Sequence, residues 1–202
     1  MKTMITIGRQ FGSGGKEIGI RVAKELGIPF YDKELLQEAA KKSGLCQKIF
    51  ENFDERPKSL LYAIAMDAYP LGFSGATGES LEQQVHLAIF KTIRNIAEEG
   101  PCVIIGRCAS AILRGAGEHP LSVFIYADPA DRTRRIAARN GLDERRAMHR
   151  AQKIDRMRKH HFDFYADTLW GEPASYDLML SSSEYGITGA AEVIAAAARA
   201  GK

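Results

Sequence analysis

The chain opens with a short apolar run, a glycine-rich loop and an amphipathic stretch, in that order. The run Ile5-Thr6-Ile7 is rich in β-branched residues and predicts a buried strand. Three glycines and a serine follow in residues 12–15, and apolar residues then recur with helical spacing at Ile18, Val22 and Leu26. A strand that turns through glycines into a helix describes a binding site for phosphate.

The composition of the loop suits an anion. Glycines let successive backbone N–H groups turn inward, the helix N-terminus adds a partial positive charge, and Lys16 adds a full one. The loop departs from the pattern G-x-x-x-x-G-K-[ST], because with Lys16 as the lysine the first glycine falls on Gln10 and the hydroxyl on Glu17. No Ser or Thr follows the lysine to hold magnesium. Taken alone, such a loop is also compatible with a tight turn that binds no ligand.

The rest of the chain alternates strands and helices, which predicts a parallel sheet and an α/β fold. Apolar runs predict further strands near residues 27–32, 102–106, 123–126 and 176–180. Helical spacing predicts helices at 33–42, 79–99, from about 130, and at 189–200. A length of 202 residues fits one domain, residues 1–202, and is enough to bury a sizeable core.

Bulk composition narrows the function classes. The hydrophobic fraction of 45% and the charged fraction of 26% are ordinary for a soluble globular protein. A net charge of +3 is too small to indicate nucleic-acid binding by itself, and no apolar run approaches the length of a membrane span. The N-terminus shows no signal-peptide pattern, and three cysteines without C-x-x-C spacing suggest reduced thiols. We therefore expect a cytoplasmic protein.

Two more polar features follow predicted strands. Ligands bind beyond the carboxyl ends of the strands in an open parallel sheet, and Asp32 and Gly106-Arg107 fall at such ends. The Arg107 guanidinium can grip a phosphate or a carboxylate in bidentate fashion, or it can pair with a structural carboxylate at a helix start. Cys108 is expected to fill space rather than react, because no histidine neighbours it in sequence.

A basic stretch runs from Arg132 to Lys159, and most of its charges are interpreted as a solvated helix face. Lys153, Asp155, Arg156 and Arg158 differ because an aromatic cluster follows them at residues 160–165. A short helical hairpin with several arginines at this point in the chain suits a lid over a transferred phosphate. The spacing of His149, His160 and His161 suits no common zinc site, so no metal site is predicted there.

In order and spacing these motifs resemble the cytidylate kinases, and more closely the cytidylate-kinase-like bacterial proteins. The resemblance rests on the glycine loop, Phe30-Tyr31-Asp32, Ile105-Gly106-Arg107, Ile125-Tyr126-Ala127-Asp128-Pro129 and Asp155-Arg156-Met157-Arg158. It implies a three-layer P-loop kinase fold with a five-stranded parallel sheet. It also implies a helical insert for a nucleoside monophosphate at about 33–100 and a lid at about 142–174.

The resemblance implies roles for single residues as well. The donor would lie on Gly12, Ser13, Gly14, Gly15, Lys16 and Glu17, and the acceptor on Asp32, Arg107 and Asp155. Lys16, Asp32, Arg156 and Arg158 would be the catalytic residues. Ile105 and Cys108 stand where those kinases carry acids, so Asp32 or water would have to serve as magnesium ligands.

The predicted function is therefore ATP-dependent phosphoryl transfer to a nucleoside monophosphate, with CMP or dCMP as first candidates and Mg²⁺ as the expected ion. Small-molecule nucleotides are the expected partners, and nucleic acid and membrane are not; the oligomeric state is left open. Two alternatives share the donor site: a nucleotide-binding regulator without turnover, and a kinase for a small molecule or a protein. A nucleic-acid-binding module on residues 132–159 is a weaker alternative that would show steeply salt-dependent affinity.

Overall fold

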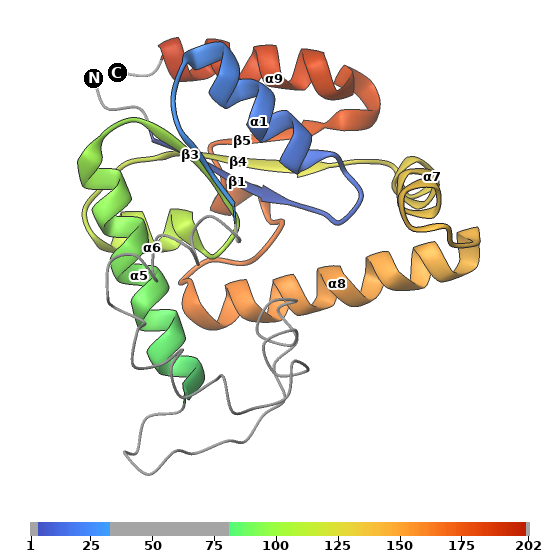
Figure 1. Cartoon of the computed structure of the whole chain (residues 1–202), viewed down its shortest axis with the longest axis horizontal. Coiled ribbons are helices and arrows are strands. Elements are labelled where there is room, and N and C mark those ends of the chain that lie inside the picture. Colours follow the sequence, from blue (N-terminus) through green and yellow to red (C-terminus); the bar gives the residue numbers. More distant parts are fainter. Residues whose placement is uncertain (1–3, 33–80, 201–202) are drawn as a thin grey trace.

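A computed structural model describes residues 4–32 and 81–200, with only the backbone of 81–86 described. A five-stranded parallel sheet lies at its centre, in the order β2-β3-β1-β4-β5 (Figure 1). The strands are β1 (Met4–Arg9), β2 (Phe30–Tyr31), β3 (Cys102–Ile105), β4 (Leu121–Tyr126) and β5 (Leu178–Ser181). The parallel sheet expected from the alternation of strands and helices is confirmed.

Two helices cover one face of the sheet: α1 (Gly15–Leu26) and α9 (Ser182–Ala200), which lie above it in Figure 1. Ile5, Ile7 and Val103 point to this face and pack against Ile18 of α1 and Ile194 of α9. Buried alanines of α9 allow it to lie close to α1. The helix begins seven residues earlier than predicted because Gly186, with φ 64°, joins a first turn to the main segment.

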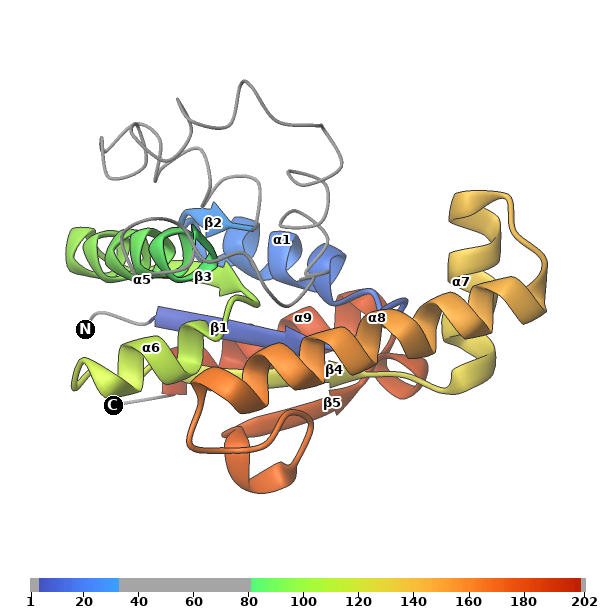
Figure 2. The same cartoon turned by 90° about the horizontal axis from the view of Figure 1, so that it is seen from below.

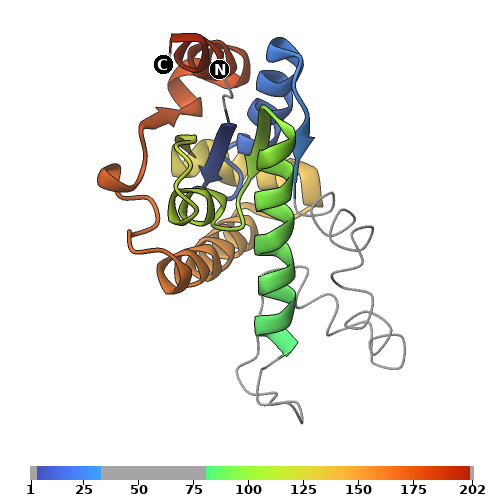
Figure 3. The ribbon, with the colours of Figure 1, turned by 90° about the vertical axis from the view of Figure 1, so that its left-hand side faces the viewer.

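Three helices cover the opposite face: α5 (Leu81–Glu99), α6 (Ala109–Gly115) and α8 (Glu144–Tyr165). Figure 2, seen from below, shows α8 crossing this face, and Figure 3 shows the layers end on. Met4, Ile104 and Phe124 point to this face, where they pack with Ile93 of α5 and Phe162 of α8. The side chains of successive strand residues thus point to opposite faces of the sheet, and both faces are buried. This explains the continuous apolar runs.

The connection between β4 and β5 carries α7 (Pro129–Asn140) and α8, which pack against each other. The sequence predicts a short helical hairpin as a lid at about 142–174, but this range holds the single helix α8 of 22 residues, and the hairpin is formed by α7 and α8; the lid role stays a prediction. A 3-10 turn, η1 (Pro173–Ser175), leads into β5. Of the predicted insert at 33–100, residues 33–80 and the helix expected at 33–42 lie outside the described residues.

Candidate active site

The glycine loop connects β1 to α1 at the carboxyl end of the strand, as the sequence predicts. Gly12 and Gly14 have φ of 82° and 78°, a conformation that side chains with a Cβ rarely adopt. Helix α1 begins at Gly15, and the first bond that it closes runs from the Ile18 amide to the Gly14 carbonyl. The amides of Gly15, Lys16 and Glu17 come before this bond, and a helix leaves such amides without an internal acceptor. They therefore form a natural anion site.

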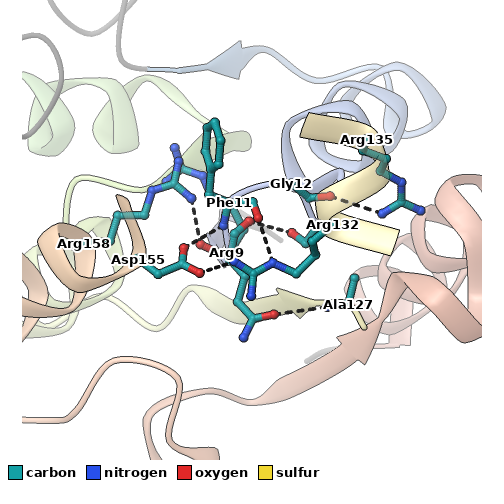
Figure 4. Close-up of polar contacts among 10 residues, drawn as sticks. Arg9, Phe11, Gly12, Ala127, Arg132, Arg135, Asp155 and Arg158 are labelled. Carbon is teal, nitrogen blue, oxygen red and sulfur yellow. Dashed lines mark hydrogen bonds and ion pairs between the residues drawn. The ribbon is translucent and has the colours of Figure 1, made fainter. Parts of the chain in front are cut away.

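Side chains from three other helices bind the backbone carbonyls of this loop, and Figure 4 shows the arginines of α7 and α8 among them. Arg158 Nη1 donates to the Arg9 carbonyl at 3.0 Å, and Arg132 Nε donates to the Phe11 carbonyl at 2.8 Å. Further along, Arg135 Nη1 donates to the Gly12 carbonyl at 3.4 Å. The Ser182 hydroxyl, from the first turn of α9, donates to the Ser13 carbonyl at 2.6 Å.

Asp155 lies against the loop rather than in a separate pocket. Its Oδ1 accepts from the Phe11 amide at 2.7 Å, and its Oδ2 pairs with Arg132. Burial raises the pKa of the Asp155 carboxyl, although the Phe11 hydrogen bond and the charges of Arg132 and Arg158 act in the opposite direction. The Arg158 guanidinium also lies 5.6 Å from the centre of the Phe11 ring.

Lys16 and Asp32 meet on the β2 side of the loop. Lys16 is the second residue of α1, and its Nζ lies 2.5 Å from Asp32 Oδ2. The lysine side chain keeps 48% exposure, whereas the carboxylate side chain keeps 11%. The structure therefore brings together two predicted catalytic residues that lie 16 positions apart in the sequence.

A narrow cavity of about 40 Å³ opens between the carboxyl ends of β1 and β3. Three arginines from different elements line it: Arg9 from the end of β1, Arg107 from the turn after β3, and Arg158 from α8. His161 and Ser110 are further polar members of the lining. The volume suits a few waters or a small anion, and three guanidinium groups around it favour negative charge.

Arg107 reaches this cavity through an unusual turn. Gly106, Arg107 and Cys108 have φ of 72°, 57° and 54°, so three successive residues are left-handed. Left-handed conformations are costly for residues with a Cβ and are found mainly where the surrounding structure requires them. Arg107 is only 8% exposed. Cys108 is 4% exposed and donates to the His161 carbonyl at 3.8 Å, which agrees with a packing role for its thiol.

Not every predicted residue faces the loop or the cavity. Ser13 is fully buried, and its hydroxyl donates to the Gln10 carbonyl within the loop. Its side chain therefore stabilises the loop from inside. The side chain of Glu17 is exposed in the first turn of α1. Arg156 is exposed on α8, away from the face that carries Asp155 and Arg158, and its catalytic role stays a prediction.

The structure adds residues that sequence reasoning missed: Arg9, Arg132, Arg135 and Ser182. The sequence pattern groups Arg132 and Arg135, two of the four arginines of α7, with a solvated face. Their spacing of three residues in the first turns after β4 was an available signal, because that end of the sheet carries the glycine loop. Arg9 could have been found as the last residue of the first strand.

Magnesium ligands are sparse in the part of the chain that the structure describes. No group of three or more His, Cys, Asp or Glu side chains there is arranged to hold a metal ion. The Asp32 carboxylate at the end of β2 fits an ion that is otherwise held by phosphate oxygens and water, which is the usual coordination of Mg²⁺. Within the described residues, no helix has both the length and the apolar character to cross a membrane.

Comparisons with known proteins bear on the whole chain. A model of the cytidylate kinase-like family matches residues 4–184. The cytidylate kinase of Methanopyrus kandleri is 24% identical, over 92% of this chain and 87% of that enzyme. A crystal structure of an uncharacterized protein from Eubacterium ventriosum ATCC 27560 is 29% identical and superposes with a TM-score of 0.74, covering 98% of this chain and 99% of that chain.

More distant structures share the architecture. Shikimate kinase from Bacteroides thetaiotaomicron superposes with a TM-score of 0.54 at 14% identity, over 98% of this chain and 99% of that chain. A gluconokinase from Sinorhizobium meliloti 1021 gives 0.53 at 14% identity, over 98% and 95%. At such identities these enzymes establish the fold alone. The three-layer P-loop kinase fold expected from the sequence is confirmed.

Proposed function

The chain belongs to the cytidylate kinase-like family, and from this premise we propose that it transfers the terminal phosphoryl group of ATP to a nucleoside monophosphate. CMP and dCMP are the first acceptors to test, because the Methanopyrus kandleri relative is a cytidylate kinase. The observation that carries the proposal is the pairing of two anion sites: the glycine loop at the end of β1 and the arginine-lined cavity between β1 and β3.

The chemistry needs no base from the protein. A phosphate monoester is largely dianionic near neutral pH, so its oxygen can attack without losing a proton. A bond forms between that oxygen and the terminal phosphorus of ATP, while the bond from this phosphorus to the bridging oxygen breaks and ADP leaves. Negative charge spreads over the equatorial oxygens, so the protein must position the two phosphates and neutralise them.

The described residues divide into two groups for this task. The amides of Gly12 and of residues 14–17, together with the Lys16 ammonium, would hold the donor phosphates, whereas the Ser13 amide donates to the Gln10 carbonyl. Arg107 and Arg9 would hold the acceptor phosphate in the cavity, and Arg158 lies between the two sites because it lines the cavity and binds the loop. Asp32 would orient the Lys16 ammonium and contribute to a hydrated Mg²⁺, whose chemistry is to neutralise phosphate charge.

A coupled assay of ADP release with CMP, dCMP, UMP, AMP and GMP tests the proposal. We expect turnover that depends on a monophosphate and exceeds the hydrolysis of ATP alone, with cytidine nucleotides preferred. The regulator alternative has one observation in its favour: the pair Gly106-Arg107 is flanked by buried Ile105 and Cys108, which supply no carboxylate for a metal. ATP binding without ADP formation across the panel would support it. Turnover only with a non-nucleotide acceptor would support the third alternative.

A further inference from the structure

The orientation of the loop amides follows from what holds the loop carbonyls. A peptide unit is planar and trans, so the carbonyl of one residue and the N–H of the next point in opposite directions. The Phe11 carbonyl faces Arg132, which turns the Gly12 amide away from α7. The Ser13 carbonyl faces Ser182, which turns the Gly14 amide away from α9. Both amides therefore point away from the side chains that bind the loop carbonyls, as an anion-binding loop requires.

One charged pair, Arg132 and Asp155, binds both the amide and the carbonyl of Phe11. Its amide donates to Asp155 Oδ1, its carbonyl accepts from Arg132 Nε, and the two side chains are paired with each other (Figure 4). The side chains of Arg132 and Asp155 are only 11% and 15% exposed. A planar guanidinium can bind two acceptors in fixed directions, which an ammonium cannot do. This closed arrangement sets the direction of the Phe11 peptide units.

A second contact set holds the next two residues. Arg135 Nη1 donates both to the Gly12 carbonyl and to the Ser182 hydroxyl at 3.1 Å. The same hydroxyl donates to the Ser13 carbonyl, so Ser182, which is 1% exposed, joins α7 and α9 to the loop. Inside the loop, the Gln10 carbonyl accepts from both the amide and the hydroxyl of Ser13. The peptide units from Gln10 to Ser13 are therefore fixed by named donors or acceptors.

We propose that Arg132, Asp155, Arg135 and Ser182 are positioning residues, which hold the glycine loop in the conformation that presents its Gly12 and Gly14 amides to the donor phosphates. The inference rests on the proposed function for the identity of that anion. It gives Asp155 a role through the loop rather than through contact with the acceptor. It also makes α7, interpreted from the sequence as a solvated face, part of the phosphate site.

Two measurements on the full chain test this inference: hydrogen exchange of the peptides that cover the loop, and calorimetric affinity for ATP and for inorganic tripolyphosphate. Arg132→Ala and Ser182→Ala should speed exchange in the loop and weaken both ligands about tenfold or more. Arg132→Lys should rescue little of the loss, because a lysine restores the charge but not the two fixed directions. Arg134→Ala is the matched control, since Arg134 is 76% exposed and pairs with Asp131 on the same helix.

Each result has a definite meaning. Slower or unchanged loop exchange in folded Arg132→Ala and Ser182→Ala would overturn the inference, and so would faster exchange with unchanged tripolyphosphate affinity. If Arg132→Ala fails to fold, Ser182→Ala and Arg132→Lys decide the matter, because they remove less from the core. A wild-type chain that binds no tripolyphosphate also overturns it. Tripolyphosphate and ATP bound as expected, with no transfer to any monophosphate, would refute the proposed function and leave the inference standing.

Discussion

Replacing Gly106, which lines the arginine-lined cavity, with alanine tests the role of that cavity. A Cβ at this position would lie 2.1 Å from Arg9 Nη1 and 3.2 Å from Arg9 Cζ, so the Arg9 guanidinium has to move. The residue also has φ of 72°, which costs an alanine about 1–2 kcal/mol. For a domain of this size, that backbone cost alone lowers the melting temperature by roughly 2–8 °C.

The displaced guanidinium adds an effect on function. If Arg9 binds the acceptor phosphate, a shift that breaks this contact removes a charged hydrogen bond of about 1.5–3 kcal/mol. The kcat/KM for the acceptor should then fall roughly tenfold to a hundredfold, while the affinity for ATP stays within about twofold. Steady-state kinetics against the acceptor, together with a thermal melt of each variant, measure both parts.

Gly141→Ala is the matched control. Gly141 ends α7 with φ of 62°, and a Cβ there would meet nothing within 4 Å. The melting temperature of this variant should fall by a similar amount, and its kcat/KM for the acceptor should stay unchanged. In an Arg9→Ala background, Gly106→Ala should cost little further activity, because the group that it displaces is gone. The reasoning is refuted if Gly106→Ala leaves the acceptor kcat/KM unchanged, or if Gly141→Ala lowers it equally.

Three further outcomes are expected. Lys16→Ala should weaken ATP binding or abolish transfer, measured by calorimetry and ADP release; unchanged kinetics would mean that the ammonium is not at the phosphates. Arg107→Ala should raise the acceptor KM at least tenfold and leave ATP affinity nearly intact, and equal losses of both would contradict its acceptor role. Burial, and to a smaller extent the negative charge of Glu99, raises the pKa of the Cys102 thiol from 9.0 to about 11. Since the unfolded thiol ionises first, roughly 2–3 kcal/mol of stability present below pH 9 should be lost as the pH rises to 11. Cys102→Ala should flatten that decline in denaturant titrations, and an identical slope in both proteins would count against it.

Most of the sheet could be predicted because a strand covered on both faces needs an unbroken apolar run. Residues 102–105 show this, since their side chains alternate between two buried clusters. Boundaries were less predictable where tertiary packing decides them. Tyr176, expected in the last strand, instead packs its ring 4.9 Å from that of Phe124, and β5 begins at Leu178. The short helix α6 was missed, although Ala109, Ile112 and Leu113 recur with helical spacing; it begins directly after the left-handed residues Arg107 and Cys108.

The candidate site was predictable in part. Asp32 and Arg107 were found because each follows an apolar run, and parallel strands end at one edge of the sheet. Asp155 and Arg158 were singled out, but their contact with the loop backbone could not be foreseen. Membership of the family and the kinase fold, both expected from the motifs, are confirmed. The acceptor and the individual residue roles stay proposals.

By itself, the sequence determined the layered α/β architecture and the position of an anion-binding loop, because both follow from local patterns of apolar residues and glycines. Only the tertiary structure decided which charges serve that loop. An arginine side chain reaches several ångströms from its own helix, so Arg132 and Arg135 acquire their partners from how α7 lies against the loop, and not from their neighbours in the chain. The direction of the loop amides is therefore a property of the folded molecule.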